Sequence, residues 1–263
     1  MPVRRAWIDS VVIGAWSHAD TIRRIVPPGP LPTGPPPVVT RDLVISGRAA
    51  TWVEIDGPST ALDDLEALFD ALERALADHD LTPADVVRSR MTTATRDGRS
   101  AASEVRLRRL SVPFPCATSS YIDPSAFDAD DGIRLATLAV RDSGPGKAAV
   151  EHSPPPPPWK FVATGDLSFL SGITSPADGI GAQTPEIRAR VVATLALVGE
   201  RIGRPVRPTT VSAYVGRSVA LEAVGDLAAL VGLDGTPIAV RRCDGFATQA
   251  SVIEIEIDAA ATR

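Results

Sequence analysis

Two glutamates near the end of the chain have the residue type and spacing that proton-transfer chemistry requires. In residues 250–257, Glu254 and Glu256 alternate with isoleucines at a period of two. This alternation predicts a half-buried β-strand with both carboxylates on one face. Two neighbouring carboxylates can serve as general acid and general base. A solvated strand face has the same pattern, so the residues alone leave both interpretations open.

Further polar side chains precede that strand. Asp244 could orient a water molecule or a substrate hydroxyl, or form an ordinary Asp-Gly turn. Cys243 is a candidate nucleophile or substrate contact, but no histidine lies near it in the sequence, so a small core residue is the preferred interpretation. Tyr214 and Arg217 lie at the end of a strand candidate, residues 208–215, and are candidate groups at the rim of a pocket.

Composition argues against several classes of function. The chain has 263 residues, of which 44% are hydrophobic and 22% charged, and its net charge is −5. These values are typical of a soluble globular protein and argue against a nucleic-acid-binding surface. There is no apolar run long enough to cross a membrane and no segment typical of a signal peptide, so we expect a cytoplasmic location.

The sequence also lacks the patterns that bind cofactors. The histidines are scattered, the two cysteines give no disulfide framework, and no glycine-rich phosphate loop is present. We therefore expect neither a metal nor an organic cofactor. Arg106, Arg108 and Arg109 form a basic cluster, which we interpret as a solvated face.

Hydrophobic periodicity predicts the elements that position these residues. In the first half we expect strands at residues 38–47, 51–55, 86–95, 113–122 and 133–140, and a helix at residues 59–79. Residues 100–109 are expected to be a short helix or irregular. In the second half we expect strands at residues 161–172, 208–215, 237–243 and 250–257, and helices at residues 184–203 and 219–231.

The two halves form an internal repeat. Gly47, Pro115 and Ile133 recur as Gly172, Pro237 and Ile253, at an offset of about 120 residues. Each unit then has the order β-β-α-β-(α)-β-β, an α+β unit with helices on one face of a mixed sheet. The expected organisation is an N-terminal strand and proline-rich arm at residues 1–37, a degenerate unit at 38–145, a proline-rich linker at 146–160 and a second unit at 161–263.

This order resembles the RidA (YjgF/UK114) superfamily. The resemblance is carried by the Ser-Gly that ends an early strand, the proline that opens the penultimate strand, and the glutamate-containing last strand. Two such units in one chain, the segment FLSG at residues 169–172 and Gln183 before the long helix are similar to the chorismatases. The resemblance implies a tandem fold of the chorismate mutase-like barrel type, with Glu254 as the acid/base residue and Gln183 near the substrate.

The chain departs from RidA deaminases where these bind a substrate carboxylate. The family has an arginine two residues after the strand-opening proline, whereas this chain has Ala117 and Ala239. A methyl group cannot form the ion pair of an arginine. Arg241 shares the strand face of Ala239 and is the expected substitute. The first unit also has Arg134 where the second has Glu254.

We therefore expect a cofactor-independent enzyme of specialised metabolism that acts on a small anionic metabolite by general acid/base catalysis. Chorismatase-like enol-ether cleavage or hydrolysis is the leading reaction. The segment between the units lacks the aromatic and arginine-rich residues that line the chorismatase pocket, so chorismate itself is not implied. The expected catalytic residues are Glu254 and Asp244, and the expected substrate-binding residues are Arg241, Tyr214, Arg217, Gln183 and Cys243.

Two alternatives remain at this point. One is an imine or enamine hydrolase, or a dehydrating enzyme, with a rebuilt carboxylate-binding group. The other is a non-catalytic protein that binds a small molecule or a partner, which a cleft filled by side chains beside Glu254 would favour. RidA proteins assemble as trimers with sites between subunits, whereas a tandem chain satisfies some of these contacts internally. Homo-oligomerisation is therefore left open.

Overall fold

The computed structural model describes residues 36–262, except residues 60, 112–113, 129, 144–146, 152–158, 224–226 and 234–235. The strand expected at residues 6–15 and nearly all of the proline-rich arm lie outside the described residues. None of the helices within the described part of the chain is long and apolar enough to cross a membrane.

The first unit forms a six-stranded mixed sheet. Its strand order is β1 (Val38–Ile45), β2 (Arg48–Pro58), β5 (Gly132–Val140), β3 (Val86–Thr93), β4 (Ala117–Ile122) and β11 (Gly245–Phe246). Helices α1 (Leu62–Ala77) and α2 (Arg96–Arg106) cover one face, and a π-helical turn, Leu107–Ser111, continues α2. The leucines of α1 are spaced at helical intervals and are buried against the sheet, apart from Leu62 in its first turn.

The second unit forms a sheet of the same kind. Its strand order is β10 (Ile238–Cys243), β9 (Val206–Gly216), β12 (Ile253–Ala261), β8 (Leu167–Ile173), β7 (Trp159–Thr164) and β6 (Ala148–Glu151). Helices α3 (Gly179–Ile202) and α4 (Leu227–Leu230) pack on one face. Ile187, Val191 and Val198 of α3 are buried there, as their helical spacing predicts.

The two units are equivalent in topology. In each, one parallel pair of strands, β3 with β4 or β9 with β10, lies beside a long antiparallel strand, β5 or β12. That long strand then pairs with the hairpin that opens the unit, β2 or β8. The predicted tandem of two α+β units with mixed sheets and helices on one face is therefore confirmed.

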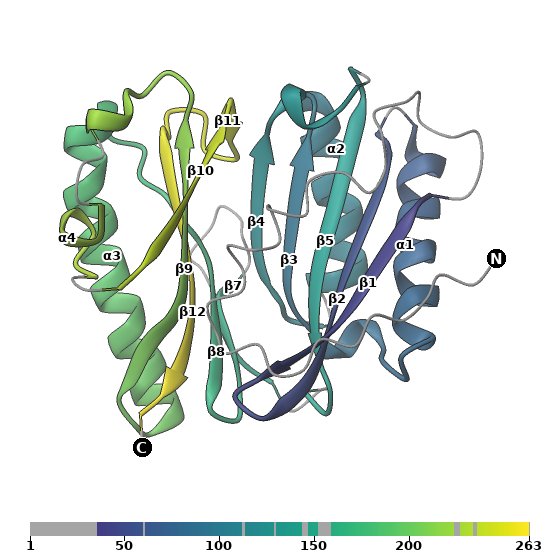
Figure 1. Cartoon of the computed structure of the whole chain (residues 1–263), viewed down its shortest axis with the longest axis horizontal. Coiled ribbons are helices and arrows are strands. Elements are labelled where there is room, and N and C mark those ends of the chain that lie inside the picture. Colours follow the sequence, from purple (N-terminus) through teal and green to yellow (C-terminus); the bar gives the residue numbers. More distant parts are fainter. Residues whose placement is uncertain are drawn as a thin grey trace.

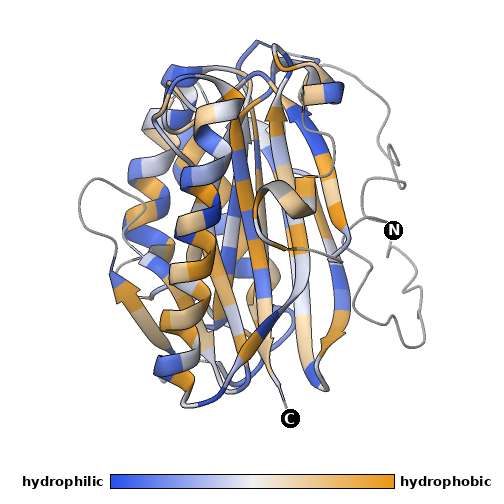
Figure 2. Ribbon diagram, turned by 90° about the vertical axis from the view of Figure 1, so that its left-hand side faces the viewer, coloured by the Kyte–Doolittle hydropathy of each residue, from blue (hydrophilic) through white to orange (hydrophobic). Residues whose placement is uncertain are grey.

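The sheets lie between the helices. Figure 1 shows α3 and α4 on one side of the molecule and α1 and α2 on the other, with both sheets in the middle. An apolar cluster joins the inner faces of the sheets and includes Trp52, Leu138 and Phe169. Bands of hydrophilic and hydrophobic residues alternate along α3 and the strands behind it (Figure 2). Because both faces of each sheet are covered, inward-pointing polar side chains are removed from water.

Three predicted segments are divided differently in the structure. The strand expected at residues 161–172 is the hairpin of β7 and β8, whose turn contains Gly165 with φ of 58°. The helix expected at residues 219–231 consists of a 3-10 turn, Leu221–Ala223, and the short α4. The segment expected as a linker, residues 146–160, contains β6 and the start of β7.

The last predicted strands are not paired with each other. β9 lies between β10 and β12, so the Asp-Gly step after β10 is not a hairpin turn. The chain instead crosses to the other sheet, where Gly245 and Phe246 form β11 beside β4, and the amide of Asp244 donates to the carbonyl of Ile122 at 2.7 Å. The second unit thus supplies an edge strand to the first.

Candidate functional site

β12 places both glutamates between the two sheets. Ile253, Ile255 and Ile257 point into the core under α3, so the alternating glutamates point toward the first unit. Glu254 is 2% exposed and Glu256 is 3% exposed. The prediction that they share a face is confirmed, whereas the expected half-buried strand is wrong, because the opposing sheet covers the glutamate face.

Glu256 is held as a carboxylate by the first unit. Arg90 on β3 donates from Nε to Oε1 at 3.1 Å and also from Nη2 to Oε2. The hydroxyls of Ser119 and Tyr121 on β4 donate to Oε1, the latter at 2.6 Å. Burial opposes ionisation, but Arg90 and Arg88 hold the pKa of Glu256 well below its usual range.

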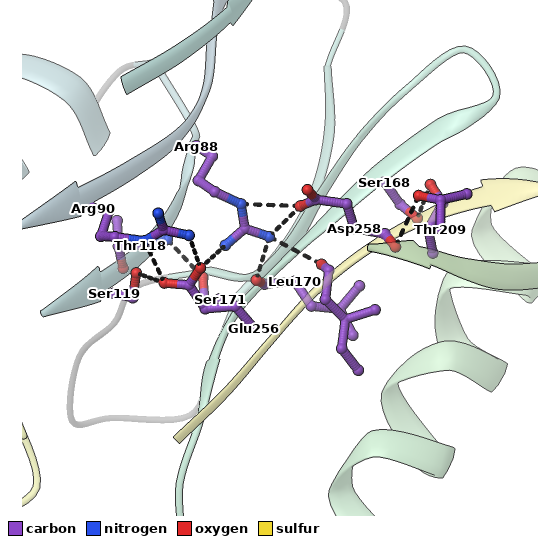
Figure 3. A network of polar contacts seen from close by, with 12 residues as sticks. Arg88, Arg90, Thr118, Ser119, Ser168, Leu170, Ser171, Thr209, Glu256 and Asp258 are labelled. Carbon is purple, nitrogen blue, oxygen red and sulfur yellow. Dashed lines mark hydrogen bonds and ion pairs between the residues drawn. The ribbon is translucent and has the colours of Figure 1, made fainter. Parts of the chain in front are cut away.

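A second buried ion pair continues this network. Arg88 on β3 donates to Oδ1 of Asp258 on β12 at 3.0 Å from Nε and 2.6 Å from Nη2. It also donates to the carbonyls of Leu170 and Ile257, at 3.0 and 2.9 Å. Figure 3 shows the arginines entering from one sheet and the carboxylates from the other. Two arginines of the first unit and two carboxyl groups of the second therefore join the units across their interface.

Glu254 has the opposite electrostatic environment. Its Oε1 is buried without a hydrogen-bond partner among the described residues. Burial, reinforced by the charge of Glu256, raises the pKa of Glu254 to about 8, against the opposing effects of Tyr121, Arg106 and Arg90. Glu254 is therefore mostly protonated at neutral pH, two residues from an ionised glutamate.

Gly172 creates the space for this carboxyl group. A Cβ atom at residue 172 would lie 1.8 Å from Oε1 of Glu254 and 2.4 Å from its Cδ. The Ser-Gly pair that ends the FLSG segment thus has a physical role. Its glycine lets β8 approach the glutamate, and its serine accepts a hydrogen bond from the amide of Thr118 at 3.0 Å.

Arginines of α2 lie on the other side of Glu254. Arg106 is buried and donates to the carbonyl of Ser119 at 2.7 Å and the hydroxyl of Ser120 at 2.9 Å. The expectation that Arg106 belongs to a solvated face is therefore wrong, because Ser119 and Ser120 of β4 bind its guanidinium. Its neighbours Arg108 and Arg109 do form surface ion pairs with acidic residues of α1.

Aromatic rings fill the space next to the carboxylates. Tyr121 and Tyr214, one from each unit, stack with ring centroids 3.6 Å apart, and Phe246 of β11 meets Tyr121 edge-on at 6.2 Å. Cys243 is buried among these rings, and burial raises the pKa of its thiol to about 12. This environment supports the interpretation of Cys243 as a core residue.

Arg241 is placed close to this group. Its guanidinium lies over the ring of Tyr214, 5.7 Å from the centroid. Its Cα is the register partner of Tyr214 in the parallel pair of β10 and β9. Arg241 and Tyr214 are therefore on the inner side of the second sheet, next to the glutamates, as a substrate-binding role requires.

The remaining predicted residues lie outside the buried cluster. Arg217 forms ion pairs with Asp123 at 2.7 Å and Asp244 at 3.2 Å, and its side chain and that of Asp244 are 43% and 39% exposed. The amide of Gln183 is directed to backbone, with Nε2 donating to Ala250 at 2.8 Å and Oε1 accepting from Val252 at 2.9 Å. Gln183 thus fixes the start of α3 to the segment before β12.

The pocket beside the ion-pair network is small. It is lined by Arg90, Thr210, Ser212, Glu256 and Asp258, with a volume of about 10 Å³. This is room for about one water molecule. In the described part of the chain, no three His, Cys, Asp or Glu side chains are grouped so as to hold a metal ion.

No protein-family model and no curated protein sequence matches the chain. The structure is similar to the crystal structure of a chorismatase, with a TM-score of 0.60 and 17% identity, over 83% of this chain and 79% of that one. YjgF-family proteins from Mycobacterium tuberculosis and Neisseria meningitidis match 39% and 44% of the chain, at 16% and 22% identity and TM-scores of 0.31 and 0.32. The chain therefore has a chorismatase-like fold.

Proposed function

We propose that the protein is an enzyme that cleaves or hydrolyses an enol ether of a small anionic metabolite by general acid catalysis. The observation that carries this proposal is the pair of glutamates on β12, whose environments move their pKa values in opposite directions. A neutral and an ionised carboxyl group side by side are a recurring arrangement in acid/base catalysis. The chorismatase-like fold supports the same reaction class.

The chemistry requires the protonated form that Glu254 adopts. Hydrolysis of an enol ether starts with transfer of a proton to the terminal alkene carbon, which leaves an oxocarbenium ion. Water adds to this ion, and the resulting hemiketal separates into a carbonyl compound and an alcohol. Glu254 would donate the first proton and regain one from the attacking water. The negative charge of Glu256 would stabilise the cation formed in between.

Substrate binding requires a rearrangement of the side chains beside Glu254. The pocket beside Glu256 has room for about one water, and the stacked rings of Tyr121 and Tyr214 lie against the register position of Glu254 on β9. β11 has only two residues, Gly245 and Phe246, and it carries the ring that packs against Tyr121. We propose that displacement of β11 opens the site.

The same packing favours a second candidate function, a non-catalytic role. If the site stays closed, Glu256, Asp258, Arg88 and Arg90 serve to join the two units, and the neutral Glu254 is tolerated beside them. The two functions differ in whether a small anion reaches Glu254.

The test is pyruvate release from chorismate, measured with the full-length protein and lactate dehydrogenase as the coupling enzyme. We expect release that falls about 100-fold or more in Glu254→Gln, which keeps the shape but has no proton to donate. Glu104→Gln, an exposed change on α2, is the matched control and leaves the rate unchanged. The proposal would be contradicted if the protein neither released pyruvate from chorismate nor bound chorismate. It would also be contradicted if Glu254→Gln kept full activity.

A further inference from the structure

One face of α2 carries a row of basic and hydroxyl side chains toward the interface between the units. Arg96, Arg99, Ser103 and Arg106 are spaced by three, four and three residues, which places them on one side of the helix. We refer to these four residues as the arginine face of α2. Arg96 donates to the carbonyl of Phe246 in β11 at 3.2 Å, and Arg106 donates to β4, so the face spans the edge of the first sheet next to β12.

The middle of this face has unused hydrogen-bond donors. Nε of Arg99 and Oγ of Ser103 are both buried from solvent, and neither has a hydrogen-bond partner among the described residues. Buried polar groups in native proteins are almost always paired. These two groups lie one helical turn apart on the same side of α2, so both could donate to the acceptors of one ligand.

The charge of the face is also uncompensated. None of Arg96, Arg99 and Arg106 forms an ion pair with a described residue. Burial and the neighbouring arginines lower the pKa values of Arg99 and Arg106, the latter to about 10. The carboxyl group of Glu254 influences both arginines but is itself mostly neutral at pH 7. A small anion would supply the missing negative charge.

We infer that Arg99, Ser103 and Arg106 bind a carboxylate of a small organic acid next to Glu254. This inference deepens the proposed function and rests on it for the identity of the substrate. It also supplies the carboxylate-binding group that is absent at Ala117 and Ala239, from a helix of the first unit. A carboxylate suits the donors, because its two oxygens can accept from Nε of Arg99 and Oγ of Ser103 together.

The test is calorimetric titration of the full-length protein with pyruvate, and separately with inorganic phosphate, at pH 7. We expect pyruvate to bind, with an affinity about tenfold or more lower in Arg99→Ala and Ser103→Ala. Arg108→Ala removes one positive charge from the exposed surface beyond α2 and leaves the affinity unchanged. Arg99 is chosen for substitution because Arg106 is buried and its replacement risks unfolding the protein. Equal melting temperatures of the variants and the parent protein confirm that the variants are folded.

The remaining results of these titrations either overturn the inference or show whether the anion site and the proposed reaction fail independently. No binding of pyruvate to the parent protein, or equal binding to both variants, overturns it. Phosphate binding with the same dependence on Arg99 and Ser103 overturns the assignment to a carboxylate. If Glu254→Gln and the parent protein both bind pyruvate through Arg99 but chorismate is not turned over, the anion site stands and the proposed reaction fails.

Discussion

Single residues decide the chemistry of this site, because two glutamates of one strand have opposite ionisation behaviour. Glu256 receives hydrogen bonds from an arginine and two hydroxyls, and each of them favours the carboxylate. Glu254 faces Gly172 and has an unpaired oxygen, so burial favours its neutral form. Alternation along the strand predicts that the two share a face, but it carries no information about what the other unit presents to each.

The raised pKa of Glu254 predicts a dependence of stability on pH. Its pKa in the folded protein is about 8, against 4.5 for the ordinary group, so folding favours the protonated form. The contribution of Glu254 to stability is therefore full below pH 4.5 and is lost as the pH rises to 8. Glu254→Gln, which cannot ionise, should be more stable than the parent protein at pH 9 by roughly 2–5 kcal/mol.

Urea unfolding of the parent protein and Glu254→Gln at pH 5 and pH 9 measures this difference. The comparison removes the contributions of Glu256, Asp258 and the arginines, which both proteins share. A difference in free energy of unfolding that is the same at both pH values would show that Glu254 does not titrate between them.

Gly172 gives a second prediction at the residue scale. Gly172→Ala places a methyl group 1.8 Å from Oε1 of Glu254, so β8 or the glutamate must move. We expect a loss of about 1–3 kcal/mol in the free energy of unfolding, as for overpacked cores, together with loss of any activity that depends on Glu254. Gly181→Ala is the matched control, since its Cβ meets nothing within 4 Å and lies in a helix. That control should be neutral or stabilising by up to about 1 kcal/mol; equal effects of the two changes would contradict the packing argument.

At the scale of elements, local periodicity predicted most strands and the long helices, because their apolar spacing is set by their own backbone geometry. Local periodicity failed for segments whose structure depends on contacts with another part of the chain. Residues 245–246 form a strand only because the edge of β4 accepts them, and the described residues of 219–231 contain a 3-10 turn and a short helix in place of the one expected helix. Arg88 and Arg90 were not identified as site residues, although two arginines spaced by two in an otherwise uncharged strand were the available signal. The burial of Arg106 could not be predicted, because it depends on tertiary contacts with Ser119 and Ser120 of β4.

The hydrogen bonds of Gln183 predict that the start of α3 stabilises the segment before β12. Its side chain joins the first turn of α3 to the backbone of Ala250 and Val252, just before β12. Gln183→Ala removes these hydrogen bonds and the buried Gln183 side chain itself, so we expect a loss of about 1–3 kcal/mol in the free energy of unfolding. Gln249→Ala, an exposed amide in the same segment, should change it by less than about 0.5 kcal/mol. If the two variants have equal stability, the hydrogen bonds of Gln183 do not stabilise the fold.

At the scale of the molecule, the two units are joined by charges as well as by apolar packing. The arginines come from β3 of the first unit and the carboxylates from β12 of the second, and Trp52, Leu138 and Phe169 shield the adjoining interface from water. Ion pairs between parts of one chain that are distant in sequence form only when both sheets have folded. The network therefore makes the stability of each unit depend on the other.

The pair of Arg88 and Asp258 tests this dependence. Arg88→Met leaves Asp258 buried without its counter-charge, so we expect a loss of about 3–5 kcal/mol in the free energy of unfolding. Adding Asp258→Leu removes that isolated charge and should recover more than half of the loss, since apolar side chains of similar size replace buried pairs well. Arg204→Met breaks an exposed ion pair with Asp166 and should change stability by at most about 1 kcal/mol. Urea unfolding followed by tryptophan fluorescence measures all three variants. If Arg88→Met behaves like Arg204→Met, or if the second substitution makes the loss larger, the buried pair does not couple the two units.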